Sequence, residues 1–348
     1  PCDIFDDEIK KKAYVSKIPL GIILAITPYN FPLNIPLHKI IPALSTGNAI
    51  IFKPSPLGKK TANLIQKLVF ESGFPKNILQ TIHCSESFLQ KLLLEKRINM
   101  VSYTGSSLFG KKIRSISKIN KINLEMGGNN PLIIMKDANL DNALSYTIKD
   151  GFGNAGQRCT AAKLIFLQKD IAKKFKDELF IRIQKIKVGN HLKKTTDMGP
   201  LVNKNVKDNL IAKIKKIDKK KFDINFFGKV SKNFVPPIII NHKKNLLEYI
   251  DDEFFGPFIQ LITFEKLSEC VKAINKSNYA LQAGIFTNSN QYINYAYENL
   301  TFGALIVNAG PGLRIESFPF GGMKDSGSGR EGVVMAMNEM MEEKILIN

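Results

Sequence analysis

The chain of 348 residues has no tryptophan, and it has few histidines, arginines and cysteines. Its four cysteines lie far apart, without a Cys-x-x-Cys pair or a neighbouring pair of histidines, so the usual spacings of a zinc site and of a disulfide framework are absent. They are Cys2, Cys84, Cys159 and Cys270. This cysteine usage is typical of a reducing compartment, so we expect a cytoplasmic protein that binds no metal.

Acidic residues are also scarce relative to basic ones, with 31 against 50, which gives a formal net charge of +19. A basic binding protein is the alternative that this charge raises, because clustered cations attract phosphate. The cations are dispersed and mostly lysine, and no nucleic-acid recognition motif accompanies them. The lysine-rich stretch 213–221 is most simply a solvated helix end and loop. We therefore expect no nucleic acid and no membrane as partners.

One segment, residues 18–37, lacks charged side chains over 20 residues, about the length that crosses a bilayer. Four prolines within it argue against a membrane-spanning helix, because proline disturbs a helix interior. They are Pro19, Pro28, Pro32 and Pro36. The segment is better interpreted as a short buried strand followed by an irregular loop.

The length and a hydrophobic content of 44% allow two sizeable cores, since single cores rarely grow beyond roughly 250–300 residues. Short apolar runs alternate with helical stretches, which predicts an α/β fold with two doubly wound parallel sheets. The first series of predicted strands covers residues 21–26, 49–52, 78–83, 100–103 and 122–124. The second covers residues 132–135, 164–167, 238–240, 259–264, 284–287 and 305–308.

Two helices are predicted from the spacing of apolar residues. The helix at 62–71 would place Leu64, Ile65, Leu68 and Val69 on one face and stop at Gly73, with Pro75 just beyond. The helix at 171–186 would bury a stripe of every third or fourth residue. That stripe consists of Ile171, Phe175, Leu179, Ile183 and Ile186.

Two short segments carry the residues for covalent chemistry. Leu124-Glu125-Met126-Gly127-Gly128 supplies a carboxylate, and Gly156-Gln157-Arg158-Cys159 supplies a thiol 34 residues after it. A base and a nucleophile are what chemistry through an acyl thioester needs. A lone cysteine is more often buried and inert, and a carboxylate at a strand end is often merely exposed. The pairing and spacing of the two segments favour the functional interpretation.

Two further blocks stand upstream and downstream: Thr27-Pro28-Tyr29-Asn30-Phe31-Pro32 and Ser317-Phe318-Pro319-Phe320-Gly321-Gly322. In this order the four blocks resemble the aldehyde dehydrogenase superfamily, from about residue 15 to the C-terminus. The resemblance implies oxidation of an aldehyde to its carboxylic acid with NAD or NADP. It makes Cys159 the nucleophile that forms a thiohemiacetal and then a thioester, and Glu125 the general base. Asn30 would stabilise the oxyanion together with the backbone N–H of Cys159.

The resemblance also implies a Rossmann-like cofactor domain. A glycine-rich helix start at Gly105-Ser106 would place backbone N–H groups beside pyrophosphate, although Gly-x-x-x-x-Gly alone is a weak signal. Lys53 would reach the adenosine ribose, and Glu253 the nicotinamide ribose, with Phe255 near the ring. The other expected cofactor contacts are Thr27, Pro28, Tyr29, Ser55, Gly110 and Gly127. Pro56 stands where many NAD-preferring members have glutamate, which leaves NAD versus NADP open.

For domains, the resemblance predicts a cofactor domain at 20–126 and a catalytic domain at 127–330. Residues near 12–19 and 343–348 would form an oligomerisation β-ribbon. The first belongs to the strand region 1–19, and the second to a C-terminal helix and strand at 331–348. Through this ribbon the chains would assemble into a homodimer or homotetramer. Family members normally carry a long N-terminal segment before Tyr14-Val15, so we expect exposed apolar surface here. A truncated, catalytically impaired homologue is the alternative.

The substrate is indicated by Leu313-Arg314-Ile315-Glu316, which resembles a subgroup that handles small polar or anionic aldehydes such as lactaldehyde or phosphonoacetaldehyde. Arg314 would bind a carboxylate or phosphonate through two hydrogen bonds, and Arg158 would add to the positive field. A salt bridge from Arg314 to Glu316 or a neighbour is equally compatible with the sequence. Transfer of the acyl group to coenzyme A is disfavoured, because family members that use it typically lack a carboxylate where Glu125 stands.

Overall fold

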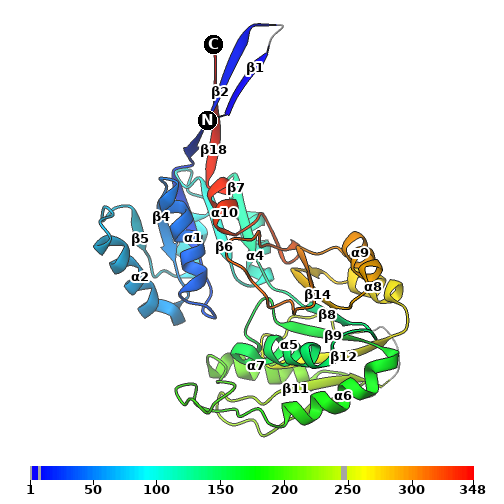
Figure 1. Cartoon of the computed structure of the whole chain (residues 1–348). Coiled ribbons are helices and arrows are strands. Elements are labelled where there is room, and N and C mark those ends of the chain that lie inside the picture. Colours follow the sequence, from blue (N-terminus) through cyan, green and yellow to red (C-terminus); the bar gives the residue numbers. More distant parts are fainter. Residues whose placement is uncertain (1, 7–8, 244–248) are drawn as a thin grey trace. The chain divides into compact units, whose positions relative to one another are not determined.

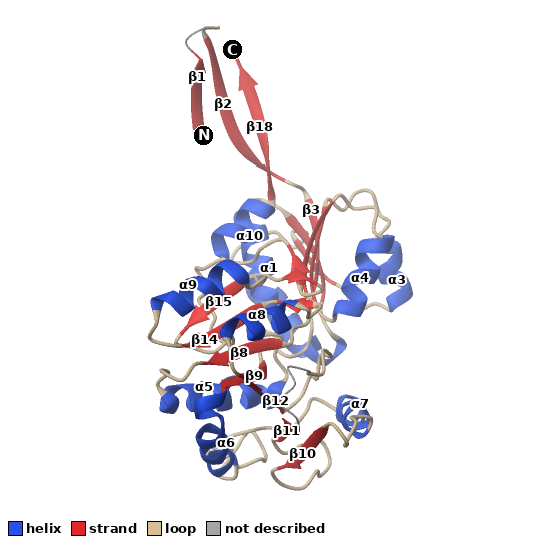
Figure 2. Ribbon diagram, turned by 90° about the vertical axis from the view of Figure 1, so that its right-hand side faces the viewer, coloured by secondary structure: helices blue, strands red, loops and turns tan. Residues whose placement is uncertain are grey.

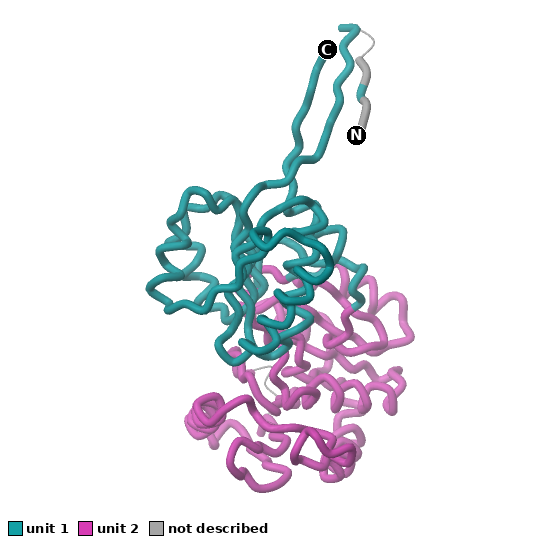
Figure 3. The backbone as a smooth tube through the Cα atoms, turned by 90° about the vertical axis from the view of Figure 1, so that its left-hand side faces the viewer, with its two compact units in different colours: residues 1–126, 315–321, 327–348 teal, residues 127–314, 322–326 magenta. Residues whose placement is uncertain are grey.

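The computed structural model describes residues 2–6, 9–243 and 249–348. The chain forms two compact units (Figure 3). Unit 1 contains Pro1–Met126, Ile315–Gly321 and Gly327–Asn348, and unit 2 contains Gly127–Arg314 and Gly322–Ser326. Each unit has a mostly parallel sheet with a separate hydrophobic core on each face. The predicted α/β class with two doubly wound sheets is confirmed.

The sheet of unit 1 has the strand order β17-β7-β6-β3-β4-β5, and all pairs are parallel except β17 with β7. The strands are β3 (Ile22–Ile26), β4 (Ala49–Lys53), β5 (Leu79–Thr81), β6 (Met100–Thr104), β7 (Lys121–Glu125) and β17 (Gly327–Ser328). On β3, Ile23 and Ala25 face one core while Leu24 and Ile26 face the other. A strand buried on both faces is apolar at every position, which is why the sequence revealed it so clearly.

Helices cover both faces of this sheet (Figure 2). One core receives α1 (Asn34–Ser45) and α2 (Lys59–Glu71), and the other receives α3 (Glu86–Leu92) and α4 (Ser107–Ile116). The uncharged segment 18–37 forms β3, a loop and the start of α1, as its prolines indicated. Among the described residues, no helix combines the length and the hydrophobicity that crossing a bilayer requires.

The predicted apolar face of α2 was half wrong. Ile65 and Val69 are buried together with Ala62, whereas Leu64 and Leu68 are 54% and 51% exposed. Successive residues of a helix lie about 100° apart, so the leucines fall beside the line that faces the sheet. The predicted stop is confirmed: α2 ends at Glu71, and Gly73 follows with φ at +91°.

The sheet of unit 2 has the order β10-β11-β12-β9-β8-β14-β15. Its strands are β8 (Asn130–Ile134), β9 (Ala162–Gln168), β10 (Phe222–Phe226), β11 (Ile238–His242), β12 (Phe258–Phe264), β14 (Gln282–Phe286) and β15 (Ala304–Val307). All pair in parallel except β10, an edge strand that the sequence analysis missed because polar residues interrupt it. Two short strands of the same unit, β13 (Tyr279–Ala280) and β16 (Met323–Lys324), form a separate two-stranded antiparallel sheet.

One face of this sheet is covered by α5 (Leu140–Phe152), α6 (Lys169–Ile183) and α7 (Lys204–Lys215), and the other by α8 (Leu267–Asn275) and α9 (Asn290–Asn299). The predicted stripe on α6 is buried from Ile171 to Ile183, and Ile186 lies just beyond the helix end. Two 3-10 turns complete the helices: η1 (Pro56–Gly58) in unit 1 and η2 (Gly153–Gly156) in unit 2.

A three-stranded antiparallel ribbon belongs to unit 1 (Figure 1). Its central strand β2 (Lys11–Pro19) pairs with β1 (Cys2–Asp6) and with β18 (Met341–Ile347), which follows α10 (Val333–Glu339). The predicted pairing of residues near 12–19 with those near 343–348 is therefore confirmed. Its role in oligomerisation stays a prediction.

The boundaries of unit 2 differ from those predicted for the catalytic domain, residues 127–330. Ile315–Gly321 and the chain from Gly327 onward group with unit 1. The reason is long-range strand pairing, because β17 adds to the edge of β7 and Phe320 pairs with Glu331.

Candidate active site

The predicted site residues of unit 1 gather at the carboxyl ends of four neighbouring parallel strands. Glu125 ends β7, Gly105 follows β6, Thr27 follows β3, and Lys53 ends β4. The backbone N–H of Thr27 donates to the carbonyl of Lys53 at 3.2 Å, and that of Gly105 donates to the carbonyl of Glu125 at 3.0 Å. Open α/β sheets bind ligands at this edge. Unit 1 therefore has a continuous row of candidate groups where a dinucleotide would be expected.

The start of α4 is shaped by packing against the sheet. Ser106 is its N-cap and accepts a hydrogen bond from the N–H of Phe109 at 3.4 Å. A Cβ atom at Gly105 would collide with the Tyr103 ring, and one at Gly110 would collide with the Met126 side chain. Both glycines are thus required for the start of α4 to pack closely against Tyr103 and Met126. Its first N–H groups and the positive end of the helix dipole suit an anion such as pyrophosphate.

The neighbouring loops are ordered by local hydrogen bonds. The Ser55 hydroxyl accepts from the N–H of Leu57 at 3.3 Å and caps η1, which begins at Pro56. Thr27 is buried, whereas Pro28, Tyr29 and Asn30 are half-buried in the loop between β3 and α1.

The Glu125 side chain is only 3% exposed. A Cβ atom at Gly321 would come within 2.8 Å of its Oε1, so the Phe-Pro-Phe-Gly-Gly block packs directly on this carboxylate. Thr104 of the neighbouring strand β6 is paired in register with Glu125. Glu125 lies at the end of a strand, as predicted. Its carboxylate is buried, so it is not an ordinary exposed carboxylate at a strand end.

A buried ion pair in unit 1 escaped the sequence analysis. Lys39 Nζ lies 2.8 Å from Glu331 Oε1 and donates to Ser102 Oγ at 3.0 Å. Thr104 Oγ1 lies 3.5 Å from the same Glu331 oxygen. The two charges are nearly 300 residues apart in the chain, so no local pattern could pair them. Removing either partner would leave a buried charge uncompensated.

In unit 2, Cys159 sits in the irregular connection of residues 154–161, here called the Cys159 turn, which starts within η2 and leads to β9. Asn154, Ala155 and Gly156 have φ values of 53°, 53° and 68°, three left-handed residues in succession. Such a conformation is costly for alanine and persists only where the surroundings enforce it. Cys159 itself is half-buried. The thiol is therefore carried by a strained, well-defined turn and not by a regular core element.

Asn130, the first residue of β8, fastens the backbone of this turn. Its Nδ2 donates to the carbonyls of Cys159 at 2.7 Å and Ala161 at 2.9 Å, and its Oδ1 accepts from the N–H of Gln282 at 3.1 Å. A Cβ atom at Gly128 would collide with the Cys159 carbonyl. The Gly-Gly-Asn-Asn sequence is therefore shaped to receive the nucleophile turn. The sequence analysis missed Asn130, whose only signal was a polar residue opening an apolar strand.

The Glu253 loop meets the same region. Glu253 Oε1 accepts from the N–H of Gly128 at 3.3 Å, and a Cβ atom at Gly127 would collide with the Glu253 carboxylate. Burial raises the pKa of Glu253, and the hydrogen bond from Gly128 opposes this. Lys213 supports the loop from outside by donating to the Glu253 carbonyl at 3.1 Å. Two predicted cofactor residues, Gly127 and Glu253, are thus brought together, and Phe255 follows in the same loop.

Lys163 is a second residue that the sequence analysis missed. Its side chain is buried, and Nζ donates to the carbonyls of Gly256 at 2.6 Å and Gly156 at 3.2 Å. Burial lowers the pKa of Lys163 to about 7, against the attraction of Glu253. A lysine at the second position of an apolar strand was its only signal in the sequence.

Arg158 links the nucleophile turn to the loop before Arg314. Its Nη2 donates to the Gly312 carbonyl at 2.8 Å, and Nη1 lies 3.7 Å from Asp150 Oδ1. Asp150 also accepts from the N–H of Gly312 at 2.8 Å; burial raises its pKa, and the Gly312 bond and Arg158 oppose this. Arg314 is half-buried at the end of that loop. In unit 1, the Glu316 carboxylate lies 2.7 Å from His38 Nε2.

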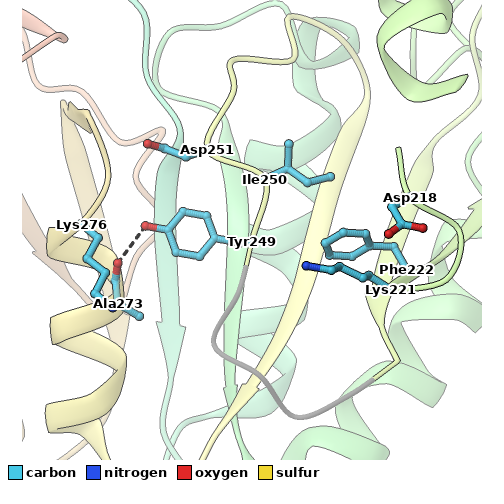
Figure 4. Close-up of a pocket in the computed structure, with 8 residues that line it drawn as sticks. All are labelled: Asp218, Lys221, Phe222, Tyr249, Ile250, Asp251, Ala273 and Lys276. Atoms are coloured by element: carbon cyan, nitrogen blue, oxygen red, sulfur yellow. Dashed lines mark hydrogen bonds between the residues drawn. The ribbon is translucent and has the colours of Figure 1, made fainter. Parts of the chain in front are cut away.

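A separate pocket of about 600 Å³ lies in unit 2 (Figure 4). Tyr249 stands in its wall, and its hydroxyl donates to the Ala273 carbonyl at 2.9 Å. None of the predicted site residues lines this pocket. We therefore do not assign it to the active site.

The structure thus sorts the predicted residues into two groups. Unit 1 holds Asn30, Thr27, Pro28, Tyr29, Lys53, Ser55, Gly105, Ser106, Gly110 and Glu125. Unit 2 holds Cys159, Arg158, Gly127, Glu253, Phe255 and Arg314. In unit 2 the loops cluster at the amino ends of β8, β9 and β12, opposite to the arrangement in unit 1.

The comparisons with known proteins agree on one family. Residues 4–346 match the model of the aldehyde dehydrogenase family. The sulfoacetaldehyde dehydrogenase of Neptuniibacter caesariensis is 40% identical over 329 residues, which cover 94% of this chain and 72% of that protein.

Solved structures match over the whole chain. The glyceraldehyde-3-phosphate dehydrogenase of Methanocaldococcus jannaschii, complexed with NADP, has a TM-score of 0.93 and 32% identity, and 76% of it is covered. The betaine aldehyde dehydrogenase of Staphylococcus aureus, a point mutant in complex with NAD+, has a TM-score of 0.94 and 28% identity, and 72% of it is covered. The chain therefore belongs to the aldehyde dehydrogenase family.

Proposed function

We propose that this protein oxidises a small anionic aldehyde to its carboxylic acid through a thioester on Cys159, with NAD or NADP as the hydride acceptor. Membership of the family makes it an oxidoreductase that acts on aldehydes. The observation that carries the proposal is the strained turn of Cys159, which Asn130 fastens through two hydrogen bonds to its backbone.

The residues at the carboxyl edge of the unit 1 sheet fit a dinucleotide. The helix start at Ser106 offers N–H groups, and side chains at Gly105 or Gly110 would abolish its close packing. Lys53 would bind the adenosine ribose, and Glu253 the nicotinamide ribose. When bound, NAD or NADP supplies the acceptor for the hydride of the aldehyde carbon.

The chain's own groups would act in sequence. The Cys159 thiolate adds to the aldehyde carbon, and the Asn30 amide and the Cys159 N–H stabilise the oxyanion of the thiohemiacetal. Loss of hydride gives the thioester. Glu125 then takes a proton from water, which attacks the thioester and releases the carboxylic acid and the thiol.

An anionic substrate is supported by Arg158 and Arg314. Arg158 precedes the nucleophile, and its contacts with Gly312 and Asp150 hold the loop that leads to Arg314. Two of the similar proteins are named for anionic aldehydes, one carrying a sulfonate and the other a phosphate. Both share a higher sequence identity with this chain, 40% and 32%, than the enzyme named for cationic betaine aldehyde, with 28%.

We also propose a homodimer or homotetramer that uses the ribbon. Its outer strand β18 pairs with β2 and exposes Ile345, Leu346 and Ile347. Exposed apolar residues on an edge strand favour pairing with another chain.

The test is reduction of NAD and NADP with sulfoacetaldehyde, lactaldehyde and betaine aldehyde. We expect turnover with the anionic aldehyde, loss of turnover in Cys159→Ala, and retention of turnover in Cys84→Ala, a cysteine outside the site. A folded wild-type protein that forms neither reduced dinucleotide nor an aldehyde-dependent thioester would instead support a catalytically impaired homologue.

A further inference from the structure

Lys163 is a buried cation whose position the proposed chemistry does not explain. It is the second residue of β9, and its side chain is 1% exposed. A lysine is almost never fully buried unless its ammonium is paired or hydrogen-bonded, because the charge loses its hydration. Lys163 must therefore gain compensating contacts where it lies.

Those contacts come from two different loops. The Gly156 carbonyl ends the left-handed turn three residues before Cys159, and the Gly256 carbonyl lies three residues after Glu253. The loops touch at this point, since a Cβ atom at Gly156 would collide with the Gly256 carbonyl. Two carbonyl oxygens that converge in this way repel each other unless a donor lies between them. The Lys163 ammonium, with three N–H donors and no acceptor, is that donor.

We propose that Lys163 is a positioning residue that fastens the turn of Cys159 to the loop of Glu253. The thiol and the carboxylate expected to bind the nicotinamide ribose then keep one fixed arrangement within unit 2. The roles assigned to Cys159 and Glu253 in this inference rest on the proposed function, whereas the link between the two loops does not.

Protonation of Lys163 should control how firmly the two loops are joined. The charged groups that act on it are Glu253, from one loop, which favours the ammonium, and Arg158, from the other, which opposes it. Burial is the larger effect and, together with Arg158, outweighs Glu253 and brings the pKa of Lys163 to about 7. Above this pH the neutral amine still donates to the carbonyls without placing a charge in the buried site, whereas any opening that exposes Lys163 favours its protonated form. The Cys159 turn should therefore be held more firmly as the pH rises through 7.

The first experiment follows alkylation of Cys159 by iodoacetamide, quantified on its own peptide by mass spectrometry, between pH 5 and 9. The wild-type rate should show an inflection near pH 7 in addition to the titration of the thiol itself. In Lys163→Met, whose unbranched side chain is one atom shorter than that of lysine and has no donor, this inflection should vanish. Above pH 7, the rate per folded molecule of this variant should exceed that of wild type by about fivefold or more.

The control is Lys213→Met. Lys213 also donates to a carbonyl of the Glu253 loop, but it further contacts Asp252 and the Phe254 ring, which lie outside the Cys159 turn. We expect its alkylation profile to stay within about twofold of wild type. Lys163→Gln retains donors on a shorter side chain and should be intermediate. The wild-type profile and Lys163→Gln keep the test decisive if Lys163→Met does not fold.

The second experiment is fluorescence titration with NADH and NADPH. If the two loops are joined through Lys163, Lys163→Met should weaken dinucleotide binding by about tenfold while it changes Cys159 alkylation. Lys169→Met, at an exposed lysine of α6 that pairs with Glu265, should leave binding nearly unchanged. A lower melting temperature with an unaltered alkylation profile and unaltered dinucleotide affinity would overturn the inference.

The inference and the proposed function fail separately. Alkylation requires neither a substrate nor turnover, so the link between the loops can be established in a protein that oxidises no aldehyde. Full turnover in Cys159→Ala would refute the proposed function and leave the alkylation result in place. A wild-type alkylation profile without an inflection near pH 7, equal to that of Lys163→Met, would refute the inference and leave the proposed function intact.

Discussion

Replacing Asn130 with alanine should destabilise unit 2 and release the backbone that carries Cys159. The Asn130 side chain is 0% exposed and makes three hydrogen bonds. Alanine would leave the carbonyls of Cys159 and Ala161 and the N–H of Gln282 buried without this partner. Each such group costs about 1–3 kcal/mol, so the loss for the three groups should be on the order of 3–9 kcal/mol.

That loss is large relative to the total stability of a folded domain, about 5–15 kcal/mol. For a unit of this size, each kcal/mol shifts the melting temperature by about 2–4 °C, so a decrease of roughly 6–36 °C is expected. The measurement is thermal unfolding by circular dichroism, combined with the rate of Cys159 alkylation well below the transition. Because the turn is strained, we expect alkylation per folded molecule to change as well.

The chain offers a matched control in Asn48→Ala. Asn48 is also 0% exposed, and it bonds the N–H of Gly21 at 2.8 Å, Thr46 Oγ1 at 2.8 Å and the Met340 carbonyl at 2.9 Å, all in unit 1. It should lose similar stability without altering Cys159 alkylation. If Asn130→Ala costs under about 1 kcal/mol, or if both variants alter alkylation equally, Asn130 does not hold the turn as argued.

Four further outcomes are expected. In rapid-mixing experiments, Glu125→Gln should give a burst of about one reduced dinucleotide per active chain. The steady rate after the burst should be at least about a hundredfold below that of wild type, because water is no longer deprotonated. Undiminished steady turnover would contradict this. The folded pKa of Lys163, about 7, lies below its ordinary value of 10.5, so the unfolded chain binds a proton that the folded chain lacks between these values. Stability should thus rise with pH across that window by up to about 1.4 kcal/mol per unit, and urea unfolding of Lys163→Met should lose this slope. Arg314→Ala should raise KM for sulfoacetaldehyde about tenfold or more with a smaller change in kcat, whereas Arg182→Ala on α6 should not; equal effects on a neutral aldehyde would exclude anion recognition. Leu346→Lys should dissociate the oligomer in analytical ultracentrifugation, while Leu64→Lys, at a similarly exposed leucine on α2, should not; an unchanged mass in Leu346→Lys would remove the ribbon from the interface.

The sequence by itself determined the strands that are buried on both faces. β3 is a continuous apolar run, and β8, β9 and β12 are mostly apolar, because helices cover both sides of a doubly wound sheet. It also determined Cys159 and Glu125 as candidates, because the blocks around them are local and ordered along the chain. The end of α2 could be predicted from Gly73, because the left-handed conformation that ends a helix is a local property of glycine.

Only the tertiary structure decided which of these segments meet. The row formed by Glu125, Gly105, Thr27 and Lys53 depends on the strand order β7-β6-β3-β4, which no local spacing specifies. The same holds for Asn130 on the Cys159 backbone and for Lys163 between the carbonyls of Gly156 and Gly256, where the partners are up to 93 residues apart. Exposure of Leu64 and Leu68 likewise followed from the orientation of α2 on its sheet. Hydrophobic periodicity encodes burial, but hydrogen bonds between distant loops arise only once the sheets have brought those loops together.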